Sequence, residues 1–417
     1  MATAAVSAAP LDGVAYSPPT RQRIDSIDLL RGLVMVIMML DHVRDYFSAA
    51  TFQFDPTNLE RTSIVLFFTR WITHFCAPVF FFLAGTGAYL RHARGTTNAE
   101  LSRFLVSRGL WLIVLELTVL RFLITADFFP RGVYLGQTIW ALGWSMIVLA
   151  TLIHLPLGVI AAFGGVMVAF HNAFDGVKLP PCNPGAPQCA GSDLFAYVLH
   201  VQGMLQLRPG GPAFLAFYPL IPWIGVMALG YVFGRLYTMD APSRRRILIR
   251  LGGGIIAFFV LLRATNLYGD PSRWSVQSRG AAFTALSYLN LTKYPPSLLY
   301  LCMTIGPSIL LLAFLERERR STIGRGLVTY GRVPMLYYVL QWVWAHGLAF
   351  VAYAVAGKPN DALFIFHNNS PEQLARAGFS LPVVYVMWIA GVFALYPVCA
   401  KYAELKRRRN DWWLGYL

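Results

Sequence analysis

Charged residues are scarce in this chain: they make up 13% of its 417 residues, whereas hydrophobic residues make up 56%. In a soluble domain about a quarter of the residues are usually charged, so this composition argues against an ordinary water-soluble protein. The apolar residues come in runs of about 17 to 25, the length that a helix needs to cross a bilayer. Runs this continuous do not fit the alternating strands of a membrane β-barrel. We therefore expect an all-α, polytopic integral membrane protein.

Motifs of soluble nucleotide and metalloprotease chemistry are also missing. The sequence has no Walker-type phosphate loop, no GxGxxG after a strand and no HExxH pair. Its five cysteines lack metal-ligand spacing, so we expect no metal. Cys182 and Cys189 bracket CNPGAPQC in a long outer loop, where a disulfide and two free thiols are equally compatible with the sequence.

Ten apolar stretches are predicted to cross the membrane as helices. They span residues 28–49, 65–90, 105–124, 137–154, 157–171, 214–237, 250–267, 296–315, 327–355 and 380–402. The net charge of +15 lies mainly in short segments that face the cytoplasm if the N-terminus is inside. This pattern predicts two cytoplasmic termini and argues against nucleic-acid binding. We expect a disordered tail over residues 1–20, a single transmembrane domain over 21–402 and a basic cytoplasmic tail over 403–417.

Ionisable side chains occur within several of these apolar stretches, where they are costly and therefore candidates for function. His42 lies in the first predicted span and His74 in the second. A rise of about 1.5 Å per residue places both about 16 to 21 Å above the inner boundary, together with Glu116, Arg263 and Gln341. We expect one polar cavity in the outer half of the membrane. Hydrogen bonds that only pack the helices are the alternative for each residue.

Two carboxylates adjoin His42 in the first span. Asp45 follows at i+3 and could accept the imidazole N–H, which would fix the tautomer of the ring. Asp41 projects about 100° away and is better placed to pair with Arg44. Asp45 is therefore a candidate for catalysis, and Asp41 a candidate for the polar cavity.

Pro78 follows His74 by four residues in the second span. Proline has no N–H, so the carbonyl of His74 is free for a ligand, water or a neighbouring helix, and the helix should kink there. Arg70 lies one turn earlier on the same face and is a further cavity residue. Glu116 could balance Arg263 or Arg121 as a structural ion pair as readily as it could take part in catalysis.

Six stretches of the chain together are similar to the heparan-α-glucosaminide N-acetyltransferase-like family of membrane proteins, in particular to its bacterial branch. They are RIDSIDLLRGLVMVIMMLDHVRDYF, WITHFCAPVFFFLAGTGAYL, FYPLIPWIGVMALGYVFGRLY, LRATNLYGDPSRW, YPPSLLYLCMTIGPSILLLAFLE and YGRVPMLYYVLQ. The resemblance extends over residues 21–402. It implies a transmembrane acyltransferase that takes an acyl group, such as acetyl, from cytoplasmic acyl-CoA to a sugar amine on the outer side.

The chain departs from this family at the catalytic histidine, which the resemblance places between the first two spans. No histidine occurs from Val43 to Thr73. His42 lies where the family has a functional asparagine, and His74 where it has an acidic residue. The resemblance therefore implies a class of reaction, while the roles of individual residues are our own hypothesis.

The leading hypothesis is a membrane acyltransferase in which His42 or His74 is the general base or a proton relay and Asp45 orients His42. Arg31, Arg91 and Arg94 would bind the phosphates of acyl-CoA, although each also fits an ordinary positive-inside anchor. The outer loops 172–213 and 268–295 would meet a sugar or glycan acceptor. The location would be a bacterial cytoplasmic (inner) membrane, and a homodimer is compatible with the sequence. A proton-coupled small-molecule transporter and a non-catalytic scaffold are the alternatives.

Overall fold

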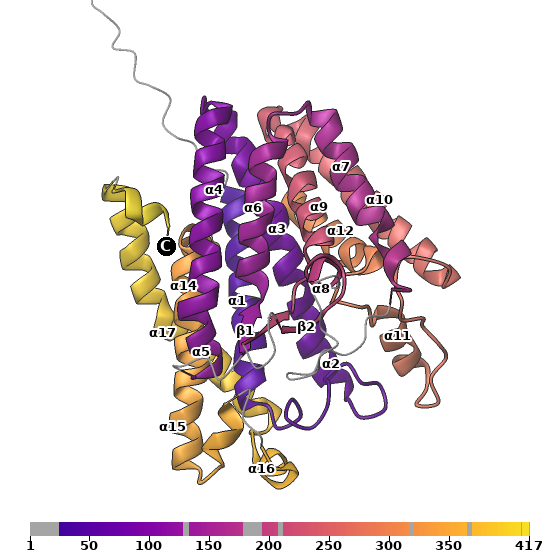
Figure 1. Ribbon diagram of the computed structural model, residues 1–417, viewed down its shortest axis with the longest axis vertical. Helices are drawn as coiled ribbons and strands as arrows, with labels where there is room; N and C mark the ends of the chain where they lie inside the picture. The colour runs from indigo at the N-terminus through magenta and orange to yellow at the C-terminus, as the bar shows by residue number, and fades with distance from the viewer. Residues whose placement is uncertain are drawn as a thin grey trace, which may run out of the picture.

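Helices that run along the length of the molecule form most of the computed structural model (Figure 1). The structure describes residues 25–127, 133–177, 194–206, 212–316, 321–364, 369–409 and 411–416. The predicted tail at 1–20 and the cysteine pair Cys182 and Cys189 lie outside these residues. Seven helical segments in the described part are long and apolar enough to cross a membrane. The expected all-α, polytopic architecture is confirmed.

The main helices and strands follow one another along the chain, with shorter helical turns between them. The helices are α1 (Asp25–Phe47), α2 (Ile64–Trp71), α3 (Cys76–His92), α4 (Asn98–Leu115), α5 (Arg121–Thr125), α6 (Thr138–Leu152), α7 (Leu157–Phe170), α8 (Leu194–Leu199), α9 (Leu220–Phe233), α10 (Ala241–Thr265), α11 (Ala281–Leu289), α12 (Leu298–Leu315), α13 (Thr322–Arg332), α14 (Pro334–Trp342), α15 (Leu348–Val355), α16 (Pro371–Arg376) and α17 (Leu381–Arg408). The strands are β1 (Val133–Gly136), β2 (Gly203–Gln206) and β3 (Ala213–Ala216).

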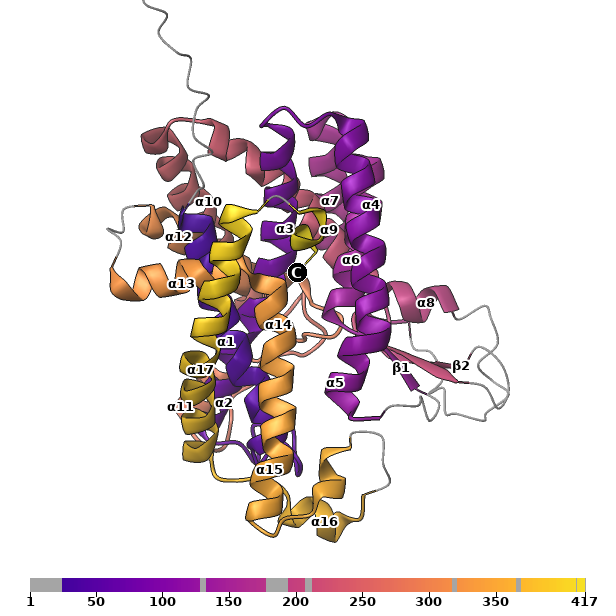
Figure 2. The ribbon, with the colours of Figure 1, turned by 90° about the vertical axis from the view of Figure 1, so that its left-hand side faces the viewer.

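Each predicted span contains a helix or a run of helices, but not every one meets the length and hydropathy of a spanning segment. The predicted span 214–237 is wrong at its start, because its first residues form β3 and α9 begins at Leu220. Among the described residues α1 carries several charges, and α6 has 15 residues. The predicted span 327–355 is wrong at its start, because the helix is interrupted at Val333: α13 ends at Arg332 and α14 begins at Pro334. Proline cannot continue a helix but fits its first turn. α13 consequently lies across the direction of the long helices (Figure 2).

Helix α1 lies in the middle of the bundle and contacts α3, α12, α13, α14 and α17. Its approach to α13 is especially close, since a Cβ atom at Gly32 would collide with the Leu327 carbonyl and one at Gly331 with the Asp28 carbonyl. Glycine permits this backbone contact because it has no side chain. The polar residues of α1 are thereby enclosed by other helices.

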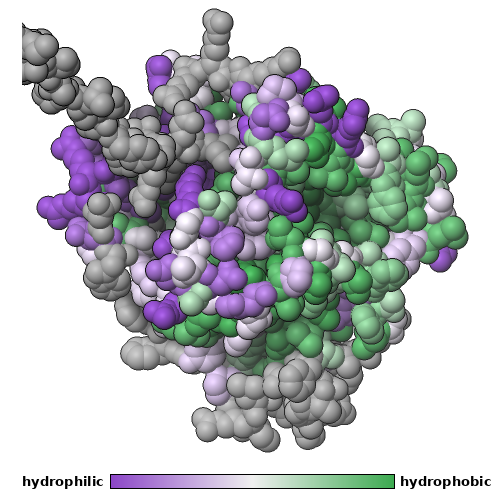
Figure 3. Space-filling model, turned by 90° about the horizontal axis from the view of Figure 1, so that it is seen from above, coloured by the Kyte–Doolittle hydropathy of each residue, from purple (hydrophilic) through white to green (hydrophobic). Residues whose placement is uncertain are grey.

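Large hydrophobic side chains are exposed on the outward faces of α7, α10 and α17, including Val166, Leu261 and Phe393. Seen from above, hydrophobic residues cover one side of the visible face, whereas hydrophilic residues gather on the other (Figure 3). Apolar residues exposed in this way suit contact with lipid tails.

A three-stranded sheet in the order β1-β3-β2 lies outside the helical bundle. Strands β1 and β3 pair in parallel, with Val133 opposite Ala213. Strands β2 and β3 pair antiparallel, with Gly203 opposite Ala216. We predicted a loop over 172–213. Four-residue strands in such a stretch show too little alternation to be recognised from sequence.

Candidate functional site

An ion pair connects α1, which carries His42, with α2, which ends just before the turn that carries His74. Nη1 of Arg70 on α2 lies 2.7 Å from Oδ1 and 2.8 Å from Oδ2 of Asp41 on α1. Thr73 donates its hydroxyl to the same carboxylate over 2.8 Å, and Nη1 of Arg44 lies 2.8 Å from it. The predicted Asp41–Arg44 pair is confirmed. The Asp41–Arg70 ion pair therefore holds α1 against α2. Asp41 directly precedes His42, and Arg70 lies about one turn before His74.

His42 is buried and packs against α14. Its ring is stacked on Trp342 with 3.7 Å between the centroids, and Tyr338 meets it edge-on at 5.8 Å. The Nδ1 atom has no hydrogen-bond partner in the described part of the chain. The expected bond from His42 to Asp45 is not formed, since Asp45 instead accepts from Nη2 of Arg44 over 2.6 Å. A charged guanidinium attracts a carboxylate more strongly than a neutral imidazole does.

His74 is 3% exposed and lies in a 3-10 turn, Ile72–Phe75, between α2 and α3. Its carbonyl accepts a hydrogen bond of 2.8 Å from the Tyr300 hydroxyl on α12. Pro78 cannot donate to that carbonyl, so the prediction that a neighbouring helix could use it is confirmed. The Nδ1 atom of His74, like that of His42, is buried without a partner among the described residues.

Glu116 does not form an ion pair with Arg263 or Arg121, which was one of the two alternatives that the sequence left open. Its Oε2 accepts from the backbone N–H groups of Ile139 at 2.9 Å and Trp140 at 3.2 Å. These groups belong to the first turn of α6, where N–H groups lack partners within the helix. The carboxylate therefore caps α6. Its other oxygen is buried and unpaired within the described structure.

Gln341 on α14 is fully buried beside Trp342. Its Nε2 lies 3.3 Å from the sulfur of Met38 on α1, and its Oε1 has no partner among the described residues. Gln341 therefore contacts the same helix as His42, although no bond connects the two side chains. Its place in a polar layer with His42 is compatible with the structure.

Arg263 is absent from this cluster, which corrects the prediction of a single layer. Its guanidinium donates to four carbonyls of the following outer segment, over 2.7 to 3.1 Å: Ser272, Ser287, Tyr288 and Asn290. The depth estimate was misleading because the rise per residue gives the height of Arg263 in the membrane but not the direction in which its side chain points. Arg263 organises an outer loop, residues 266–297, instead of lining a cavity.

The same outer loop brings two residues to the site that sequence reasoning missed, Lys293 and Tyr294. Lys293 is close enough to interact electrostatically with Asp41, His42 and His74. The Tyr294 ring packs against Phe217 with 4.5 Å between centroids. The sequence signal was weak: a lysine immediately before the apolar start of a span usually marks an interface anchor.

Asp270 holds the outer loop in shape near Lys293. It accepts from the backbone N–H of Ser272 at 2.7 Å and of Thr292 at 2.9 Å, and from the Ser297 hydroxyl at 2.5 Å. Burial raises the pKa of Asp270, and the hydrogen bonds from Ser297 and Thr292 oppose this shift. Lys293 is thus presented by a braced loop.

The predicted phosphate-binding arginines are only partly brought together. Arg31 forms an ion pair of 3.1 Å with Asp28, and Arg91 lies 4.0 Å above the Phe104 ring. Both interact electrostatically with Arg108, a residue that the sequence did not single out. Arg94 is exposed and does not share these contacts.

The C-terminal turn, Trp412–Gly415, packs beside one of these arginines, Arg108 on α4. Arg108 donates to the Gly415 carbonyl, and the Tyr416 hydroxyl lies 3.2 Å from that of Ser107. Leu414 is buried. The segment that we expected to be a basic tail therefore reaches back to the middle of α4, after α17 has continued to Arg408.

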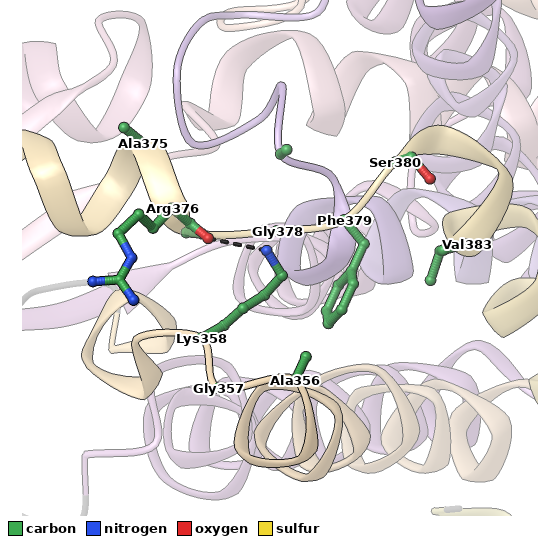
Figure 4. Close-up of a pocket in the computed structure, with 11 residues that line it drawn as sticks. Ala356, Gly357, Lys358, Ala375, Arg376, Gly378, Phe379, Ser380 and Val383 are labelled. Atoms are coloured by element: carbon green, nitrogen blue, oxygen red, sulfur yellow. Dashed lines mark hydrogen bonds between the residues drawn. The ribbon is translucent and has the colours of Figure 1, made fainter.

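A separate pocket of about 710 Å³ lies at the C-terminal ends of α1, α15 and α16 and the start of α17. None of the predicted site residues lines it. Lys358 turns its ammonium toward the Arg376 carbonyl, 3.1 Å away, and the Arg376 guanidinium extends in another direction (Figure 4). The two cations do not converge on one ligand position. No group of three or more metal-ligating side chains occurs among the described residues.

Comparison with known proteins connects this site to a family. The model of the family described as heparan-alpha-glucosaminide N-acetyltransferase, catalytic, matches residues 23–265. The match contains both histidines, whereas Lys293 and Gln341 lie beyond it. No curated protein matches the chain. Because the matched range covers more than half of the chain, this all-α membrane protein belongs to the heparan-alpha-glucosaminide N-acetyltransferase catalytic family.

Proposed function

We propose that the protein is a membrane-embedded acyltransferase that transfers an acyl group, in the first place acetyl, from cytoplasmic acyl-CoA to a sugar or glycan on the outer side. One observation carries the residue assignment. His42 and His74 are both buried, each with an Nδ1 that has no hydrogen-bond partner among the described residues, and the Asp41–Arg70 ion pair lies next to both in the chain. The proposed location is the bacterial cytoplasmic membrane.

The proposed reaction uses one of these histidines as a general base. The acceptor nitrogen attacks the carbonyl carbon of the thioester and gives its proton to the unpaired Nδ1 of His42 or His74. A carbon–nitrogen bond forms, the carbon–sulfur bond breaks, and the histidine returns the proton to the departing thiolate. A positioned base of this kind contributes about 10²- to 10⁴-fold in rate.

The donor would bind from the cytoplasmic end, where Arg31, Arg91 and Arg108 gather. Guanidinium groups recognise phosphate through paired, charge-assisted hydrogen bonds, which suits the nucleotide part of acyl-CoA. The reaction as proposed needs no metal.

Acetyl transfer by the purified full-length protein in nanodiscs tests this proposal. We expect acetyl-CoA and glucosamine to yield free coenzyme A thiol and an acetylated amine. His42→Ala and His74→Ala are each compared with wild type, and the base is the residue whose loss lowers kcat by about 10²-fold or more. His92→Ala is the control, because this ring contacts the Thr96 carbonyl near the cytoplasmic end of α3.

Two results would contradict the assignment. If the double variant His42→Ala/His74→Ala transfers acetyl at the wild-type rate, neither histidine is the base. If wild type transfers no acetyl but takes up solute in proteoliposomes when a proton gradient is applied, the protein is a transporter.

A further inference from the structure

The outer loop over residues 266–297 is fixed to the helical bundle at several points. Arg263 on α10 holds four of its carbonyls, and Asp270 closes it onto Thr292 and Ser297. The Asn290 side chain donates to the Thr57 carbonyl over 3.1 Å, and the Pro296 carbonyl lies 2.9 Å from Nε2 of His171. These contacts flank Lys293 on both sides. The backbone that carries this lysine is therefore held in place.

Lys293 differs from the other cations of the site because, among the described residues, it forms no ion pair with a carboxylate; Asp41, with which it interacts electrostatically, is in direct contact with two arginines instead. Arg70 is bound to Asp41, and Arg44 contacts both Asp41 and Asp45. The Lys293 Nζ lies over the Tyr294 ring, 5.1 Å from its centroid. A partly buried ammonium that forms no direct ion pair is stabilised when a ligand supplies negative charge beside it.

The position of this unpaired charge matches the place where the proposed reaction develops an anion. Lys293 interacts electrostatically with both buried histidines and with Asp41 between them. A base that removes a proton from the attacking amine must lie near the carbonyl under attack. A cation close to that base can therefore face the carbonyl oxygen. Fixed charges aimed at developing charge are among the strongest contributions to catalysis.

We propose that Lys293 is a catalytic residue that stabilises the oxyanion formed during acyl transfer. As the acceptor nitrogen bonds to the carbonyl carbon, the π electrons of the C=O bond move to oxygen, and the Lys293 ammonium stabilises this negative charge without giving up a proton. When the C=O bond re-forms, the thiolate of coenzyme A leaves and takes the proton held by histidine. Arg263 and Asp270 are positioning residues, because they act through the loop. This inference rests on the proposed acyltransferase function.

Steady-state kinetics of Lys293→Met in nanodiscs tests the inference, with acetyl-CoA and glucosamine as substrates. We expect kcat to fall by about 10²- to 10³-fold, as for loss of one oxyanion donor, while both KM values stay within about twofold. Lys293→Arg should retain part of the rate because it keeps the charge. Lys293→Gln serves as the neutral variant if the methionine variant does not give a monodisperse protein.

Lys358→Met is the matched control. Lys358 also lies on the outer side, and its Nζ is also 5.1 Å from an aromatic centroid, that of Phe379. An active wild type with an unchanged kcat in Lys293→Met would overturn this inference and leave the acyltransferase intact. A raised KM for the acceptor at constant kcat would also overturn it, in favour of acceptor binding. A wild type that acetylates no amine would overturn both proposals.

Discussion

The carboxylate of Asp41 lies 2.7 Å from Nη1 of Arg70, and this contact joins α1, which bears His42, to α2, which leads into the turn that bears His74. The side chains of both residues are largely buried, at 15% and 14% exposure. Removing one partner of such a pair leaves an uncompensated charge, whereas removing both does not. The relative placement of His42 and His74 depends on this contact.

Asp41→Asn is expected to destabilise the protein by about 3 to 5 kcal/mol because Arg70 loses its partner. Thermal unfolding in detergent measures the loss. The double variant Asp41→Asn/Arg70→Met should recover a large part of it. If the two substitutions instead add, the residues are not coupled and the ion pair does not hold the helices.

Tyr300→Phe should cost about 1 to 3 kcal/mol, because the buried His74 carbonyl then has no donor. The same substitution should lower kcat, since the turn that carries His74 loses its contact with α12. Thermal unfolding and acetyl transfer are measured together. Tyr288→Phe is the comparison, because its hydroxyl contacts the Val260 carbonyl on an exposed face. Equal effects of the two variants would argue against a special role of Tyr300.

Local relations along one helix were predictable from the sequence, and relations between helices were not. The Asp41–Arg44 pair and the free carbonyl before Pro78 follow from i+3 and i+4 spacing. Asp45 shows the limit of this reasoning, because its spacing to His42 is suitable but Arg44 competes for it. Such competition depends on rotamers that packing determines.

Helix positions were also predictable, since apolar runs mark them directly. Glu116 and Arg263 were placed in one layer by height alone. Their actual partners depend on how each helix is rotated and on where the loops return to the bundle. Lys293 was missed for the same reason: its role depends on the path of a loop of about 30 residues, and apolar periodicity gives no information on such a path.

Glu116→Ala and Arg263→Met should have independent effects on stability. Glu116 caps α6, and loss of a cap costs about 0.5 to 2 kcal/mol. Arg263 braces an outer loop through different contacts. The double variant should therefore equal the sum of the single variants to within about 0.5 kcal/mol in thermal or denaturant unfolding. A coupling energy clearly above that value would show that Glu116 and Arg263 interact directly, which would contradict the contacts described above.

Arg108→Ala is expected to raise the KM for acetyl-CoA by about tenfold, the effect of losing one charged hydrogen bond to phosphate. Arg31→Ala should act in the same direction. Arg94→Ala is the matched control, because it removes an exposed arginine that does not share the contacts of the other three. Equal KM values for Arg108→Ala and Arg94→Ala would show that acetyl-CoA does not bind at Arg108.

The stability contribution of Asp270 should depend on pH. Burial raises its pKa above the ordinary 3.8, so folding favours the protonated carboxyl. This contribution is present below the unfolded-state pKa and is lost as the pH rises through the folded-state pKa. Wild type should therefore gain stability relative to Asp270→Asn when the pH falls from 7 to 4. A relative loss over this range would show that the hydrogen bonds outweigh burial.

Acetyl transfer across a sealed membrane tests the central claim most directly. Wild type is reconstituted in proteoliposomes with radiolabelled acetyl-CoA on one side and glucosamine on the other, beside His42→Ala/His74→Ala. We predict that label appears on the amine across the membrane with wild type and falls by about 10²-fold or more with the double variant. Label that never reaches the amine with wild type, or that reaches it equally with the double variant, would contradict the account.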